Sequence, residues 1–184
     1  MKMNVTAARD GAAGAEESDI CPAESSTRSA QAVAGYDGRV SEIHGFEVTA
    51  IDFSMVAVTQ IKKALGNFDG KIIHGDFFKF DFPGDFDLIY ERTFLCALHP
   101  RRWPQYAKRI AQLLRPRGKL VGVFFYGTEP DPPPYPLSKT RAAEIFGKYF
   151  RLARDVKVSD SVAMFAGMER WQEWQLRLGA GKKD

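Results

Sequence analysis

The chain has 184 residues, of which 45% are hydrophobic and 12% aromatic, and it carries a formal net charge of +3. This length and composition are typical of one globular domain, and so weak a positive charge gives no support for a nucleic-acid partner. The sequence has no run of about 18 apolar residues, so we expect no membrane partner. Two cysteines, Cys21 and Cys96, are too few for a disulfide framework and favour a cytoplasmic protein.

The character of the sequence changes near His44. Residues 1–34 contain nine alanines and no aromatic residue. Such a stretch buries too little apolar area to offset the entropy lost on ordering, and it lacks the apolar core of a secretory signal. We therefore expect residues 1–43 to be disordered or foreign to the domain, residues 44–178 to form one domain, and residues 179–184 to be a short tail.

The first half of this domain alternates between apolar, strand-like runs and a helix. Ser54 is a typical N-cap, and apolar residues at helical spacing follow it as far as Gly66. The Pro83-Gly84 turn leads into a further apolar run. The pattern predicts strands over residues 46–53, 71–74 and 86–91, and a helix over residues 55–65.

The second half begins with a helix over residues 103–115, where Pro104 occupies the first turn. The continuous apolar run over residues 119–126 is typical of a strand that is buried on both faces. A proline-rich loop follows, and Ser138 is placed to cap a helix that ends at Phe146. Residues 151–178 alternate in a way that suggests two antiparallel edge strands.

This order of strands and helices predicts an α/β fold with parallel strands and crossover helices, in which ligands bind at the carboxyl ends of the strands. The polar residues at those ends are Asp52, Asp76, Glu91 and Arg92. An acid that follows the second strand is the usual partner of the ribose hydroxyls of a nucleotide-like cofactor. Asp52 has that position.

Three segments resemble the class I S-adenosylmethionine-dependent methyltransferases, and within them the thiopurine and thiol/halide methyltransferase group. The resemblance covers residues 44–178, and it implies a Rossmann-like sheet with flanking helices. The segments occur in the order found in that family. They are His44-Gly-Phe-Glu-Val-Thr-Ala-Ile-Asp52-Phe-Ser54, Phe86-Asp-Leu-Ile-Tyr-Glu-Arg-Thr-Phe-Leu-Cys-Ala-Leu-His-Pro100 and Asp131-Pro-Pro-Pro-Tyr-Pro-Leu-Ser138.

The chain departs from this family at the glycine-rich loop that follows the first strand. In the matching stretch, Thr27–Asp37, only Gly35, Tyr36 and Asp37 fit the pattern. The family's glycines let the backbone approach the cofactor without a Cβ in the way. We expect the first strand and this loop to be missing or altered, and we hypothesise that the first forty or so residues come from a misplaced start or a shifted reading frame.

The resemblance implies S-adenosylmethionine as the cofactor and assigns residues to it. Asp52 is expected to bind the ribose, with Phe53 beside it, and Asp76 and Phe77 to contact the adenine. The alternatives are an acid that favours a helix dipole for Asp52, and a turn acid and a core phenylalanine for Asp76 and Phe77. The resemblance adds two further cofactor residues, Gly35 and Glu91.

Two catalytic residues are expected at the mouth of the site. Arg92 is expected to bind an anionic substrate, and Tyr135 to close the pocket, although a loop tyrosine that merely packs on the sheet is nearly as good an interpretation. No His/Cys cluster has metal-ligand spacing, so no metal is expected. The oligomeric state is left open.

The resemblance implies methyl transfer to a small molecule, namely a thiol, a thiopurine or a halide, by direct displacement. A thiol with a pKa of about 8.5 is partly ionised at neutral pH, which explains why no strong acid–base pair stands out. Two alternatives remain. One is a truncated or inactive scaffold that has lost cofactor binding, and the other is a nicotinamide-dependent dehydrogenase, disfavoured because no Gly-x-Gly-x-x-Gly precedes Asp52.

Overall fold

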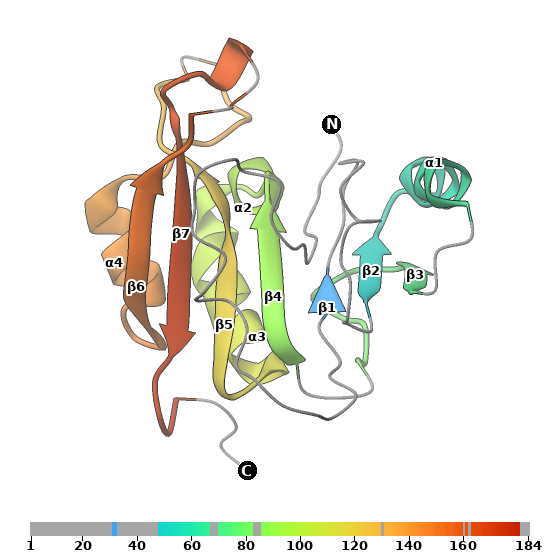
Figure 1. Cartoon of the computed structure of the whole chain (residues 1–184), viewed down its shortest axis with the longest axis horizontal. Helices are drawn as coiled ribbons and strands as arrows, with labels where there is room; N and C mark the ends of the chain where they lie inside the picture. Colours follow the sequence, from blue (N-terminus) through green and yellow to red (C-terminus); the bar gives the residue numbers. More distant parts are fainter. Residues whose placement is uncertain are drawn as a thin grey trace.

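The computed structural model describes residues 31–32, 48–66, 70–82, 86–129, 131–159, 161 and 163–180. Within these residues, seven strands form a five-stranded sheet in the order β1-β4-β5-β7-β6 and a parallel pair β2-β3. Figure 1 shows β2 on the far side of β1 from β4. The strands are β1 Gln31–Ala32, β2 Thr49–Asp52, β3 Lys71–His74, β4 Phe86–Arg92, β5 Leu114–Phe125, β6 Phe150–Lys157 and β7 Glu169–Leu176.

The first strand is short but present. Gln31 and Ala32 pair in parallel with Ile89 and Tyr90 of β4. The expectation that this strand is missing is therefore wrong for these two residues, and whether the strand is altered stays a prediction. Gly35 and the rest of the stretch that matches the glycine loop lie outside the described residues.

Local signals explain the first helix, α1, which spans Met55–Leu65 as predicted. The Ser54 hydroxyl accepts the N–H of Ala57 at 3.3 Å, which caps the first turn. The chain leaves the helix at Gly66, where a φ of 53° suits a residue without a Cβ. This helix connects β2 to β3, and β3 has its predicted bounds.

Two short helical segments separate β4 from α3. They are α2 (Phe94–Ala97) and the 3-10 helix η2 (Pro100–Arg102), and the sequence pattern did not predict α2. The next helix, α3 (Trp103–Leu113), ends two residues before the predicted boundary because the chain already joins β5 at Leu114, opposite Phe86. The strand β5 consequently begins before its predicted start at residue 119.

The helix α4 (Lys139–Phe146) begins after Ser138, whose hydroxyl accepts the Arg141 N–H at 3.1 Å. The two strands after it are antiparallel, as predicted. The expectation that both are edge strands is wrong for β7, which lies between β5 and β6 and pairs with both. Gln172, Glu173 and Trp174 of β7 are all buried, as is usual for a strand in the interior of a sheet.

Apolar side chains fill both faces of the sheet. The larger cluster includes residues of α3 and α4, and also Ile89, Leu120 and Phe124. The smaller cluster lies on the α1 side and joins Ile61 to residues of β2, β4 and β5. Among the described residues, no helix has both the length and the apolar character needed to cross a membrane.

Candidate functional site

Polar side chains gather at the carboxyl ends of β2, β3 and β4, which is where an α/β sheet binds ligands. Asp52 is the last residue of β2, and Asp76 follows β3 by two residues. Gly75, between β3 and Asp76, donates its N–H to the carbonyl of Asp52 at 2.9 Å, so the two acidic segments lie side by side. Glu91 and Arg92 end β4, which lies on the other side of β1 from β2.

Asp52 holds a buried oxygen that the described part of the protein does not satisfy. Its side chain is 5% exposed, and Oδ1 accepts the N–H of Ser54 at 2.7 Å. The second oxygen, Oδ2, is buried and has no hydrogen-bond partner within the part of the chain that the structure describes. Burial raises the pKa of this carboxyl, against the opposing effects of the Ser54 N–H and of nearby His74. Asp52 therefore offers a free acceptor to a donor from outside the protein.

The neighbours of Asp52 differ in exposure. Phe53 directly follows it and is 55% exposed, so its ring is open to a ligand. The Asp76 carboxylate accepts the N–H of Phe78 at 2.8 Å and shapes the turn after β3. Phe77 lies in the core, where its ring packs edge-on against Phe94 at 5.3 Å. A contact of Phe77 with a cofactor stays a prediction, as do those of Phe53 and Asp76.

The carboxylate of Glu91 fixes the start of α2. Its Oε1 accepts the N–H of Phe94 at 2.9 Å, and its Oε2 accepts the N–H of Leu95 at 3.1 Å. The hydroxyl of Tyr106, on α3, donates to Oε2 at 2.9 Å. Both oxygens of Glu91 are thus engaged by the protein, and its predicted role toward a cofactor stays a prediction.

Glu91 is 1% exposed, and this burial raises the pKa of its carboxyl to about 7, although the bonds from Tyr106, Leu95 and Phe94 oppose the shift. Burial also raises the pKa of Tyr106 well above its usual range, and the charge of Glu91 adds to that effect. The hydroxyl proton therefore stays on Tyr106 and remains available to Glu91 at all ordinary pH values.

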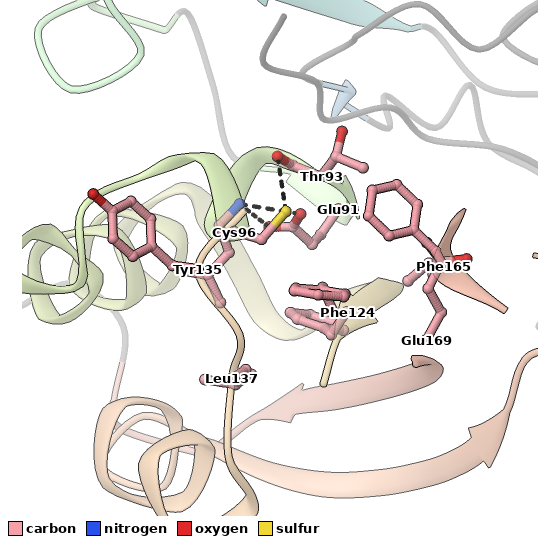
Figure 2. Close-up of a pocket in the computed structure, with 11 residues that line it drawn as sticks. Glu91, Thr93, Cys96, Phe124, Tyr135, Leu137, Phe165 and Glu169 are labelled. Carbon is pink, nitrogen blue, oxygen red and sulfur yellow. Dashed lines mark hydrogen bonds between the residues drawn. The ribbon is translucent and has the colours of Figure 1, made fainter. Parts of the chain in front are cut away.

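A small pocket lies at the carboxyl ends of β4 and β5. In Figure 2, Glu91 and Cys96 lie near its centre, Tyr135 lies on one side, and Phe165 and Glu169 lie on the other. The remaining lining residues come from β4 to α2, from the end of β5 and from the loop before α4. They are Thr93, Leu95, Val123, Phe124, Phe125 and Leu137.

The proline-rich loop is held over this pocket by its backbone. Tyr135 donates its N–H to the carbonyl of Cys96 at 2.6 Å, and Leu137 donates its N–H to the carbonyl of Phe125 at 2.8 Å. The ring of Tyr135 packs edge-on against His99, with 5.5 Å between the ring centres. Tyr135 thus lines the pocket as expected of a closing residue, and its catalytic role stays a prediction.

The predicted site residues are only partly brought together. Glu91 and Tyr135 share the pocket, and Asp52, Phe53 and Asp76 share the neighbouring edge of the β2-β3 pair. Arg92 is half-buried at the end of β4 but does not line the pocket. Its role toward an anionic substrate stays a prediction.

Sequence reasoning missed Glu169. It begins β7, is 4% exposed, lines the pocket, and its Oε2 has no hydrogen-bond partner in the described part of the chain. Glu169 follows a stretch of small and apolar residues and looks like any solvent-facing acid at a strand start. No local signal in residues 151–178 could have identified it, because its burial depends on the pairing of β7 with β5.

The residues present fit a nucleotide-like cofactor at the end of β2. The orphaned Oδ2 of Asp52 is an acceptor that ribose hydroxyls would satisfy. The pocket at the ends of β4 and β5 is separate from this acceptor and can take a second, smaller molecule. The arrangement suits a reaction between a bound cofactor and a small substrate.

Comparisons with known proteins agree with this description. The family model for thiopurine S-methyltransferase (TPMT) matches residues 42–177. The chain is 29% identical over 147 residues to a probable thiol methyltransferase 2 of Arabidopsis thaliana, covering 77% of this chain and 65% of the relative. It is 27% identical over 135 residues to thiocyanate methyltransferase 1 of Brassica oleracea, covering 70% and 59%. The chain thus spans less than two thirds of the length of these relatives.

Among solved structures, the chain resembles the N-methyltransferase NodS of Bradyrhizobium japonicum in complex with S-adenosyl-L-homocysteine. The TM-score is 0.58 at 16% sequence identity, and the match covers 71% of this chain and 66% of NodS. At this identity the likeness shows the fold alone. The predicted Rossmann-like α/β fold with flanking helices is confirmed.

Proposed function

The chain belongs to the thiopurine S-methyltransferase family, and from this we propose that it transfers a methyl group from S-adenosylmethionine to a small nucleophile such as a thiol, a thiopurine or a halide. The named relatives act on thiols and on thiocyanate, which are small nucleophiles of this kind. We further propose that residues 44–178 form the methyltransferase domain. We also propose a cytoplasmic location, because the buried free thiol of Cys96 suits a reducing compartment.

One observation carries the proposal: Oδ2 of Asp52, at the carboxyl end of β2, is buried and has no hydrogen-bond partner among the described residues. Leaving a buried acceptor unsatisfied costs roughly 1–3 kcal/mol, so the fold keeps this oxygen in place at a cost that a ribose hydroxyl would offset. Asp52 is thus the residue that would hold the ribose of S-adenosylmethionine. Phe53 and Asp76 flank it, and we propose that they contact the adenine together with Phe77. Gly35 and Glu91 remain proposed cofactor residues from the resemblance.

When bound, S-adenosylmethionine supplies a methyl group that its sulfonium already activates. The protein's part is to hold the acceptor in line and to exclude water, which is catalysis by proximity. Phe124, Phe125 and Leu137 make the pocket wall apolar, and Tyr135 covers it. Arg92, at the end of β4, is proposed to attract anionic acceptors to the mouth.

Isothermal titration of the purified chain with S-adenosylmethionine, S-adenosylhomocysteine and NAD tests the cofactor directly. We expect heat of binding with the first two and none with NAD. A chain that binds none of the three would support the inactive scaffold, and a chain that binds NAD alone would support a dehydrogenase. Either outcome would overturn the proposal.

A further inference from the structure

Glu169 is a buried carboxylate that faces the pocket with a free acceptor. Only 4% of its surface is exposed, and Oε2 has no hydrogen-bond partner among the residues described. Its backbone is fixed, because the carbonyl accepts the N–H of Val158 at 3.2 Å and the residue pairs with Phe125 in β5. A carboxylate oxygen held in this way can accept a hydrogen bond from a molecule in the pocket.

The other polar groups of the pocket are already committed. Both oxygens of Glu91 accept hydrogen bonds from α2 and from Tyr106. Burial raises the pKa of the Cys96 thiol to about 12, and the charges of Glu91 and Glu169 contribute to the shift. Cys96 therefore stays protonated, and its Sγ donates to the carbonyl of Thr93 at 3.4 Å. Among the described residues that line the pocket, Glu169 is therefore the carboxylate with an oxygen that accepts no hydrogen bond.

The charges of the residues that line the pocket determine which acceptor binds there most readily. Two carboxylates, Glu91 and Glu169, line the pocket, and its described lining includes no lysine, arginine or histidine. Arg92, which follows the lining residue Glu91, ends β4 outside that lining. A halide or thiocyanate anion would meet a repulsive field there. A neutral molecule that brings its own hydrogen-bond donor would be favoured.

We propose that Glu169 accepts the proton of a small uncharged thiol, so that this site favours neutral thiols over preformed anions as acceptors. The inference rests on the proposed function. In this step the S–H bond breaks and an O–H bond forms on Oε2 of Glu169. The electron pair left on sulfur forms the bond to the methyl group, and the electrons of the broken methyl–sulfonium bond stay on the departing thioether. The proton then passes from Glu169 to solvent.

The pocket is small, with a volume of about 10 Å³, so the simplest thiol is the best probe of it. Methanethiol is therefore a suitable test acceptor, and iodide is a matched anion that has no proton to lose.

The experiment compares Glu169→Gln with the wild type on both acceptors. Loss of a general base lowers rates by about 10²–10⁴-fold, so we expect kcat for methanethiol to fall roughly a hundredfold or more while iodide methylation does not fall. Below the pKa of the thiol, the remaining rate should follow the thiolate fraction and drop about tenfold per pH unit. Glu169→Asp, which keeps a carboxylate, should restore part of the methanethiol rate.

Glu173→Gln is the matched control, because Glu173 lies on the same strand but its carboxylate is paired with Lys119 at 3.4 Å and Arg154 at 3.6 Å. This variant should keep the wild-type ratio of thiol to iodide rates. Equal losses on both acceptors in Glu169→Gln, or no loss with methanethiol, would overturn the role of Glu169.

A second readout does not depend on turnover. Isothermal titration of methanethiol into the complex of the wild type with S-adenosylhomocysteine should show binding, and Glu169→Gln should weaken that binding about tenfold, because a hydrogen bond from the thiol to a charged carboxylate is lost. Equal affinities for methanethiol in the wild type and in Glu169→Gln refute the contact between the thiol and Glu169. If neither acceptor is methylated, the proposed function fails, and this titration still decides whether Glu169 binds the thiol.

Discussion

Replacing Asp52 by asparagine should separate cofactor binding from folding. The side-chain oxygen of asparagine can still accept the N–H of Ser54, which Oδ1 accepts at 2.7 Å. The amide nitrogen takes the place of the unpartnered Oδ2. A ribose hydroxyl that would donate to Oδ2 then faces another donor, and the negative charge is lost.

The size of the effect follows from the type of hydrogen bond. A hydrogen bond to a charged group contributes about 1.5–3 kcal/mol, and each 1.4 kcal/mol is about a tenfold change in affinity. The dissociation constant of S-adenosylhomocysteine should therefore rise roughly 10- to 150-fold. Stability should move the other way: burial raises the pKa of Asp52, so its ionisation disfavours the folded state once the pH exceeds the unfolded pKa. An uncharged amide removes that cost.

Isothermal titration gives the affinity, and thermal unfolding at neutral pH gives the stability. Asp87→Asn is the control, because Asp87 lies near the N-terminal end of β4, away from the carboxyl ends of the strands. Its carboxylate forms an exposed ion pair with Arg115 at 3.0 Å. Asp87→Asn should leave the affinity for S-adenosylhomocysteine unchanged. It should change the free energy of unfolding by no more than about 1 kcal/mol. Unchanged affinity in Asp52→Asn, or a loss of affinity that follows a loss of folded protein, would refute the assignment of Asp52 to the ribose.

Three further predictions concern the fold and the acceptor. Gly122→Ala should lower the melting temperature strongly, because its Cβ would lie 1.9 Å from the carbonyl oxygen of Glu91, whereas Gly75→Ala meets ordinary contacts from 3.4 Å and should be mild; equal melting temperatures would contradict this. The pKa of Glu91 is raised from 4.5 to about 7. Its contribution to the free energy of unfolding is therefore fully present below pH 4.5 and is lost as the pH rises to about 7. Over this range the free energy of unfolding should fall by at most about 1.4 kcal/mol per pH unit. Denaturant titrations at several pH values measure that slope, which Glu91→Gln should abolish. Arg92→Ala should raise the KM for iodide more than that for methanethiol, since it removes a positive charge at the mouth; an equal rise for both acceptors would count against it.

Sequence reasoning succeeded where the determinants are local. The helix α1 has its predicted bounds because Ser54 and Gly66 are signals read within a few residues of the helix ends. Asp52 was placed at the ligand-binding edge because an acid directly follows a strand. Its unpartnered oxygen, in contrast, depends on what surrounds it in three dimensions.

Where the determinants are tertiary, the sequence was not sufficient. The helix α2 has only four residues, too few for a period, and its start is fixed by the side chain of Glu91. That carboxylate in turn depends on Tyr106, fifteen residues further along the chain. Glu169 enters the pocket only because β7 pairs with β5, an arrangement that no local pattern in residues 151–178 indicates.

The position of β7 has a consequence for folding. The strand β6 precedes β7 in the chain, yet in the sheet it pairs with β7 and not with β5. The strand β6 can therefore join the sheet only together with β7, and until β7 pairs with β5 the apolar strand β5 presents an open edge. Such edges invite pairing with other chains. A partly folded chain in which β7 has not yet paired should thus associate with other chains more readily than the complete sheet does.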